Sequence, residues 1–158
     1  MGLSKALVLK LVVGIGVCLL AVVLGSVFTS SGVRTWYPTL NKPPFTPPGW
    51  LFGPVWTVLY ILMGVAVALV WQRSSGVNAA LTVFSVQLVL NVLWSLFFFG
   101  LRLPALALVD IALLWGAIVA TLVLFWRTQP AAGALLVPYL LWVSFATMLN
   151  ASIVWLNR

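Results

Sequence analysis

Residues 50–72 read WLFGPVWTVLYILMGVAVALVWQ, a run without a charged side chain. An α-helix rises 1.5 Å per residue, so about 20 apolar residues cross the hydrocarbon core of a bilayer. Four more runs have this length and character, and they cover residues 7–29, 79–99, 104–126 and 133–156. The sequence therefore predicts an all-α integral membrane protein, in which residues 1–158 form one domain built as a bundle of five transmembrane helices.

The composition supports this fold class and excludes several others. Hydrophobic residues make up 64% of the chain and charged residues 6%, and a soluble domain of this size could not bury so much apolar surface. The basic residues lie singly, which predicts contact with lipid headgroups and no nucleic-acid partner. The chain has no histidine, one acid and one cysteine, Cys18. We therefore expect no metal site, no cofactor and no conventional acid–base catalysis.

The longest predicted connection, residues 30–49, contains Pro43, Pro44, Pro47 and Pro48. Proline fixes φ and biases the residue before it toward an extended backbone, so this loop is expected to be structured and to cover one mouth of the bundle. Five spans place the termini on opposite sides of the membrane. We call the amino-terminal side face A and the side of the loop face B. Each face carries four basic residues, so the positive-inside rule assigns no orientation.

Polar and aromatic residues recur at helical spacing inside the spans. Residues three, four, seven or eight apart share one face of a helix, and the sets with this spacing are Trp56 and Tyr60; Gln87, Asn91 and Trp94; Trp142, Ala146 and Asn150. Most of them lie in the half of the membrane nearer face B. Polar groups in a bilayer usually face an interior or a cavity, so the spacing predicts an aromatic and partly polar pocket under the loop. The alternative is that these groups only join helices through hydrogen bonds.

Asp110 is the single acid of the chain, and it lies about 9 Å into the fourth span at 1.5 Å per residue. We interpret it as structural, with Asn91, Trp94 or an arginine of a loop as its hydrogen-bond donor. The alternative is a proton-coupling residue of a small transporter, since ionisable groups inside membranes often mark transport pathways.

Ordered motifs along the whole chain resemble one known family. They are Trp36-Tyr37, Lys42-Pro43, Pro47-Pro48-Gly49-Trp50, Pro54-Val55-Trp56, Leu59-Tyr60, Gln87-Leu88, Asn91, Trp94, Asp110, Pro138-Tyr139-Leu140-Leu141-Trp142, Phe145-Ala146 and Leu149-Asn150. The chain is similar to the translocator protein family, also called the tryptophan-rich sensory protein family. The resemblance indicates a bacterial-type member in a bacterial membrane.

This resemblance implies a bundle, commonly dimeric, whose cavity binds porphyrins such as protoporphyrin IX. The ligand-binding positions that it implies are Tyr37, Pro47, Trp56, Gln87, Asn91, Trp142, Ala146 and Leu149, and the helical spacing adds Tyr60, Trp94 and Asn150. Some bacterial members imply light-dependent porphyrin degradation, for which Trp56 and Trp142 would be the catalytic residues. Tyr139 lacks the nearby basic residue of the sterol motif proposed for animal members, so sterol binding is not expected as the primary role.

We therefore expect a membrane receptor or scavenger for porphyrins or another flat apolar ligand, with a role in tetrapyrrole regulation or stress sensing. Arg34 or Lys42 would meet the ligand carboxylates, and the pocket offers no histidine or cysteine to haem iron, which favours a metal-free porphyrin. The alternatives are light-dependent degradation and transport of tetrapyrroles or lipophilic molecules. A homodimer is expected to use small residues, which let helices approach closely. The candidates are Ala112, Gly116 and Ala120; Gly14, Cys18, Ala21 and Gly25; and, by resemblance, the third span.

Overall fold

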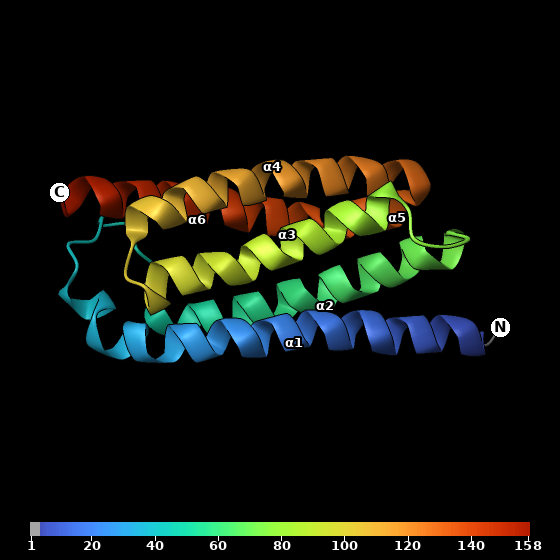
Figure 1. Cartoon of the computed structure of the whole chain (residues 1–158), viewed down its shortest axis with the longest axis horizontal. Coiled ribbons are helices and arrows are strands. Elements are labelled where there is room, and N and C mark those ends of the chain that lie inside the picture. The colour runs from blue at the N-terminus through green and yellow to red at the C-terminus, as the bar shows by residue number, and fades with distance from the viewer. Residues whose placement is uncertain (1–3) are drawn as a thin grey trace.

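The computed structural model describes residues 4–158, and the regular structure within this part is helical throughout (Figure 1). The long helices are α1 (Lys5–Thr35), α2 (Gly49–Arg73), α3 (Ala79–Ser95), α4 (Pro104–Thr128) and α6 (Val137–Leu156). The shorter segments are a 3-10 turn, η1 (Tyr37–Thr39), a π-helical turn, η2 (Leu96–Gly100), and α5 (Pro130–Leu135). Because η2 continues α3 and α6 continues α5, five segments are long and apolar enough to cross a membrane. The predicted fold class is confirmed.

The first span is longer than predicted, and the loop after it is shorter. Helix α1 continues to Thr35, so the connection to α2 comprises residues 36–48 rather than 30–49. Residues 30–35 contain no proline, and the hydroxyl of Thr35 donates to the carbonyl of Ser31 within the helix. At the other end of α1, the side chain of Ser4 accepts a hydrogen bond from the Leu7 amide and caps the helix.

The fifth span begins earlier than predicted and is broken. It starts at Pro130 rather than at residue 133, and the short α5 ends before Leu136. Pro138 explains the break, since proline has no amide hydrogen to donate and its ring clashes with the carbonyl one turn earlier. Gly133 lets α5 pack on α4, because a Cβ atom at this position would lie 2.7 Å from the Trp126 ring.

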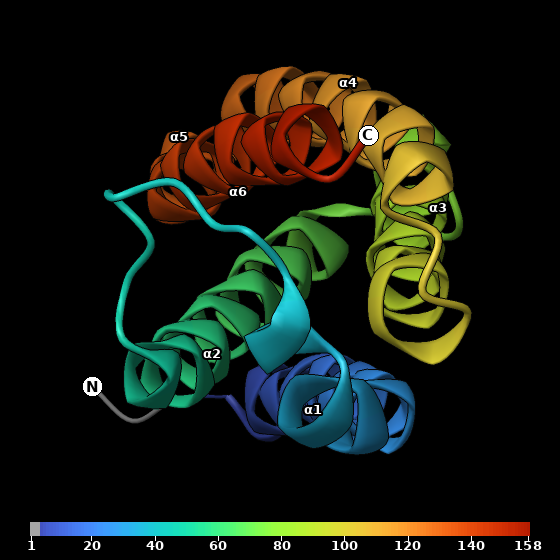
Figure 2. The ribbon, with the colours of Figure 1, turned by 90° about the vertical axis from the view of Figure 1, so that its left-hand side faces the viewer.

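The spans run side by side along the long axis of the molecule, with the amino terminus at the face-A end and the carboxyl terminus at the face-B end (Figure 1). The view onto face B places α1 and α2 on one side, α4 and α6 on the other, and α3 between α1 and α4 (Figure 2). Helix α2 packs against α1 and α5 but has little contact with α6. Helix α2 is therefore held mainly by α1 and α5 rather than by α6.

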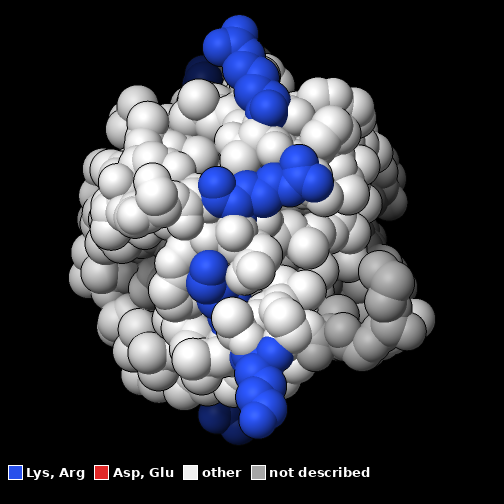
Figure 3. Space-filling view, turned by 90° about the vertical axis from the view of Figure 1, so that its right-hand side faces the viewer, with Lys and Arg blue, Asp and Glu red and all other residues white. Residues whose placement is uncertain are grey.

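Basic side chains mark the level of face A. Figure 3 looks onto this face and shows a row of lysine and arginine side chains across the molecule. Lys10 illustrates how they sit at a bilayer boundary: its ammonium donates to the carbonyl of Trp71 at 3.2 Å and lies 5.5 Å from the centroid of that ring. Such pairs of a cation and an indole suit the headgroup region, because the cation stays hydrated while the indole ring contacts apolar lipid.

Candidate functional site

A cavity of about 660 Å³ lies in the face-B half of the bundle, between α1, α2, α3 and α6. This volume is within the range of about 300–1,000 Å³ that is typical of small-molecule sites. The aromatic residues that line it are Phe52, Trp56, Trp94, Phe98, Phe99 and Trp142. Its polar lining residues include Arg34, Tyr37, Tyr60, Asn91 and Asn150. The cavity is thus an aromatic pocket with a few polar groups, at the depth that helical spacing predicted.

The structure brings together nine of the predicted ligand-binding positions. The residues that line the cavity are Tyr37, Trp56, Tyr60, Asn91, Trp94, Trp142, Ala146, Leu149 and Asn150. Two predicted positions lie elsewhere. Pro47 is half-buried in the loop and does not contribute to the wall, and Gln87 is 1% exposed and lies behind it. The contribution of π-helical Phe98 and Phe99 was missed, because the sequence carries no signal for the π turn.

A relay of buried hydrogen bonds connects α2, α3 and α6 behind the cavity. The hydroxyl of Tyr60 donates to Oδ1 of Asn91 at 2.6 Å, and Nδ2 of Asn91 donates to the Tyr139 hydroxyl at 2.7 Å. Tyr139 in turn donates to Oε1 of Gln87 at 2.8 Å. Gln87 does not line the cavity, but it bonds to Tyr139, which in turn bonds to the lining residue Asn91. The orientation of the Asn91 amide depends on both Tyr60 and Tyr139.

A second set of hydrogen bonds holds the face-B end of the cavity. The indole N–H of Trp94 donates to Oδ1 of Asn150 at 3.1 Å, and Nδ2 of Asn150 donates to the carbonyl of Pro104 at 2.9 Å. The Trp94 ring also stacks on Phe98, with ring centroids 5.2 Å apart. These contacts join α3, α4 and α6, so the Trp94 wall of the cavity is fixed in place.

Trp56 and Trp142 differ from Trp94 in having free indole donors. Trp56 packs against Tyr60 with ring centroids 5.7 Å apart, and Trp142 packs against Phe52 at 5.8 Å. Within residues 4–158, neither of these two indole N–H groups has a hydrogen-bond acceptor, whereas the N–H of Trp94 has one. Both residues line the cavity, so both place an apolar ring beside a molecule inside it, and each keeps an N–H donor without a partner in the described residues.

Tyr37 approaches the cavity from the turn η1. Its ring lies 6.3 Å from Phe98 and 5.8 Å from Phe99 between centroids. Its hydroxyl oxygen is buried, and the described part of the chain supplies no hydrogen-bond partner for it. Burial raises the pKa of the Tyr37 hydroxyl above its ordinary value, because desolvation disfavours the phenolate. The group is therefore a neutral donor that is available at the edge of the cavity.

Of the two cations that were expected to meet ligand carboxylates, only Arg34 lines the cavity. Lys42 serves the loop instead. Its ammonium donates to the carbonyls of Tyr37 at 2.9 Å and Leu40 at 2.8 Å, and it lies 5.0 Å from the centroid of the Tyr37 ring. These contacts tie the loop to itself and hold Tyr37 in position.

The proline-rich loop lies across the face-B end of the bundle, as predicted (Figure 2). Two reciprocal hydrogen bonds fasten it to the end of α6. The amide of Asn41 donates to Oδ1 of Asn157 at 2.9 Å, and Nδ2 of Asn157 donates to the carbonyl of Asn41 at 2.9 Å. The Phe45 ring adds a contact with Phe145, with centroids 6.3 Å apart. A fastened segment therefore crosses the face-B end of the bundle.

Asp110 does not belong to the cavity wall. It is 4% exposed, and within the described residues its Oδ2 atom has no hydrogen-bond donor. None of the three expected donors reaches Oδ2 within the described residues: Asn91 donates to Tyr139, Trp94 donates to Asn150, and no loop arginine bonds to it. The transporter alternative thus loses the contact between acid and substrate on which it depended.

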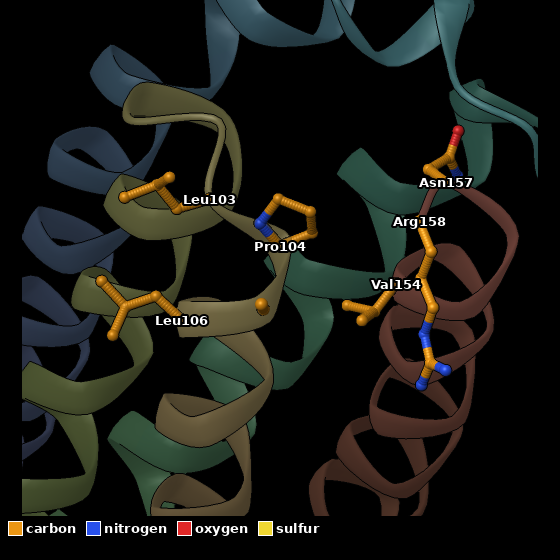
Figure 4. A pocket seen from close by; sticks show the side chains of 7 residues that line it. Leu103, Pro104, Leu106, Val154, Asn157 and Arg158 are labelled. Atoms are coloured by element: carbon orange, nitrogen blue, oxygen red, sulfur yellow. The ribbon is translucent and has the colours of Figure 1, made fainter.

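A second and smaller hollow, of about 440 Å³, lies on the surface at the face-B ends of α4 and α6 (Figure 4). Leu103, Pro104 and Leu106 form one wall, and Val154 lies opposite them beside Asn157 and Arg158. The hollow has no aromatic lining residue. The internal cavity is therefore the candidate functional site.

Fold and site together define a multi-pass integral membrane protein with an aromatic cavity in one half of the bilayer. Residues 14–156 match the model of the TspO/MBR family, and the chain belongs to this family. It is 48% identical to the tryptophan-rich protein TspO of Chlorobaculum tepidum over 154 residues, which cover 95% of this chain and 97% of that protein. The predicted family is confirmed.

Relatives with other names are similar over most of their length. The chain is 42% identical to the translocator protein of Homo sapiens over 131 residues, 80% of this chain and 78% of that protein. It is 42% identical to the tryptophan-rich sensory protein of Cereibacter sphaeroides over 122 residues, 77% of each chain. Family membership supports a role as a membrane receptor.

Proposed function

We propose that the protein is a receptor that binds porphyrins of the protoporphyrin IX type in the cavity near face B. The observation that carries the proposal is a ligand-sized cavity within the membrane whose wall includes two indoles, Trp56 and Trp142, with unused N–H donors. A porphyrin is a flat and largely apolar macrocycle, so it suits aromatic walls that bury its faces.

The polar groups of the cavity fit the remaining parts of such a ligand. Arg34 is the cationic residue on the wall, and a guanidinium can hold a propionate carboxylate with two parallel hydrogen bonds. The buried Tyr37 hydroxyl supplies a neutral donor near the covered end. The lining residues include no imidazole or thiol that would ligate haem iron, which favours a metal-free porphyrin over haem.

Titration of protoporphyrin IX into the protein in lipid nanodiscs tests the proposal, with quenching of tryptophan fluorescence as the signal. Trp56→Phe and Trp142→Phe should each weaken binding, since phenylalanine keeps an apolar ring but loses the N–H donor and part of the stacking area. Trp126→Phe is the matched control, because Trp126 is 47% exposed and lies near face A, away from the cavity. Equal affinity in all three variants would place the ligand elsewhere.

A second candidate function is light-dependent degradation of the bound porphyrin. It is favoured by the position of Trp56 and Trp142, which are oxidisable indoles on the wall of the same cavity. The porphyrin itself would be the photosensitiser, and the protein would position it near an indole. Loss of porphyrin absorbance under illumination in the presence of oxygen, slowed in Trp56→Phe or Trp142→Phe, would support this activity. Equal loss with parent protein, variants and empty nanodiscs would exclude it.

A further inference from the structure

Helices α1 and α2 are in direct backbone contact near the middle of the bundle. A Cβ atom on Gly64 would lie 2.5 Å from the Cα atom of Ile15, and a Cβ atom on Gly14 would lie 2.7 Å from the carbonyl oxygen of Gly64. No side chain separates the helices at these points. The seam between α1 and α2 is therefore closed in the middle of the bilayer.

The same two helix faces are open nearer face B. At 3.6 residues per turn, Ser26 and Val33 lie within about 20° of the face of Ile15, and Gly53 and Thr57 lie within about 20° of the face of Gly64. All four residues are exposed, and a Cβ atom on Gly53 would meet no atom of another segment within 4 Å. The two helix faces that touch in mid-membrane are thus separated nearer face B, and a gap runs between α1 and α2 toward that face.

This gap leads into the cavity. Ser26, Val33, Gly53 and Thr57 all belong to the cavity wall as well as to the surface. Gly53 and Thr57 lie roughly 6 and 12 Å from the start of α2 at 1.5 Å per residue, so much of the gap faces lipid rather than water. The loop that Asn41 fastens to the end of α6 lies across the face-B end of the bundle.

The edges of the gap are suited to contact with lipid. The hydroxyl of Ser26 donates to the carbonyl of Val22 at 2.7 Å, and the hydroxyl of Thr57 donates to the carbonyl of Gly53 at 2.9 Å. Their donors are therefore satisfied within their own helices, and they do not add unpaired polar hydrogens at the membrane. Small and internally bonded side chains leave an opening that an apolar molecule can pass.

We propose that the gap between α1 and α2 is the portal through which ligand passes between the face-B leaflet and the cavity, with Gly53 setting its width. The inference rests on the proposed function, since it assigns a route to the same site. It also narrows the class of ligand to molecules that partition into the bilayer and arrive dissolved in lipid. The loop acts as a fixed cover, and the portal lies at the side of the bundle.

Binding kinetics test the portal, because an obstruction in a route changes both rates without changing the bound state. Protoporphyrin IX fluorescence would be followed by stopped flow after nanodiscs with the protein are mixed with porphyrin-loaded vesicles. Gly53→Leu should slow association by about tenfold and slow dissociation as well, whereas a substitution that only removed contacts with bound ligand would speed dissociation. Val33→Phe narrows the gap from the side of α1 and should act in the same direction.

Two further variants complete the experiment. Gly16→Leu is the matched control, because Gly16 is exposed on α1 away from the cavity and a Cβ atom there would meet no atom of another segment within 4 Å. Asn157→Ala removes both hydrogen bonds to the Asn41 backbone and loosens the loop. The proposal expects unchanged rates in both variants.

The outcomes separate the portal from the proposed function. If porphyrin binds but Gly53→Leu and Val33→Phe keep the parent rates, while Asn157→Ala raises both rates, the route passes under the loop and the portal is refuted. If the parent protein binds no porphyrin, the proposed function and the portal are both refuted.

Discussion

Tyr139→Phe tests the buried relay that supports the cavity. The tyrosine hydroxyl accepts from Nδ2 of Asn91 and donates to Oε1 of Gln87, so its removal breaks two hydrogen bonds. Hydrogen bonds between membrane helices contribute about 0.6 kcal/mol each on average and up to about 1.7 kcal/mol. The free energy of unfolding should therefore fall by about 1–3 kcal/mol, because two buried polar groups lose their partner.

Two other tyrosines provide a graded series for the same measurement. Tyr60→Phe breaks one hydrogen bond, to Asn91, and should lower the free energy of unfolding about half as much. Tyr37→Phe removes a buried hydroxyl without a partner in the described chain and should leave stability unchanged or slightly higher. Unfolding in mixed micelles with increasing sodium dodecyl sulfate, followed by circular dichroism, gives all three values. Equal stability of Tyr139→Phe and Tyr37→Phe would refute the relay.

Asp110→Leu should raise the melting temperature in detergent, because the buried Oδ2 atom of Asp110 has no donor in residues 4–158, and a lower value would reveal a partner for it. Burial raises the pKa of Tyr37 above the ordinary tyrosine pKa of about 10. The contribution of Tyr37 to the free energy of unfolding should therefore stay level below about pH 10 and decline above it, because the unfolded chain loses the tyrosine proton first. Tyrosinate absorbance during alkaline unfolding would show this decline. In a dimer in bilayers, Gly116→Cys should crosslink between protomers and Gly14→Cys should not, because Gly116 is exposed and Gly14 packs on Gly64; the reverse result would contradict the use of α4.

The fold could be predicted from the sequence because five apolar runs have the length of a bilayer. The ends of the spans were harder to place, because apolar length does not show where a helix stops in the headgroup region. Residues 30–35 are polar enough to suggest a loop, yet the hydroxyls of Ser30 and Thr35 bond within α1 and the helix continues. The break before α6 depends on one residue, Pro138, whose effect on the preceding turn is local.

The wall of the cavity could be predicted because helical spacing and depth together place side chains in three dimensions. The position of Gln87 shows the limit of this reasoning. Gln87 shares a helical face with Asn91, but it lies one turn deeper, where it accepts a hydrogen bond from the buried Tyr139 of α6 and does not line the cavity. Spacing within α3 does not show which side chain of another helix lies opposite.

Small residues on α1 illustrate a second limit. The stripe that begins at Gly14 and Cys18 was a candidate for dimerisation, but these residues are buried within the protomer. A stripe of small residues predicts close approach of some helix and does not identify it. Ala112 and Gly116 on α4 are exposed and remain available to a second protomer.

The most direct measurement of the central claim is the affinity for protoporphyrin IX after the cavity has been filled. Ala146 is 9% exposed and lines the cavity, so Ala146→Phe places a ring where the ligand is proposed to lie. Ala112→Phe makes the same change on the exposed surface of α4. Porphyrin titration in nanodiscs should show affinity at least about tenfold weaker for Ala146→Phe and unchanged for Ala112→Phe, since lost contacts at the centre of a site commonly exceed 1.4 kcal/mol. Parental affinity in Ala146→Phe, with the variant folded, would contradict the claim that this cavity holds the ligand.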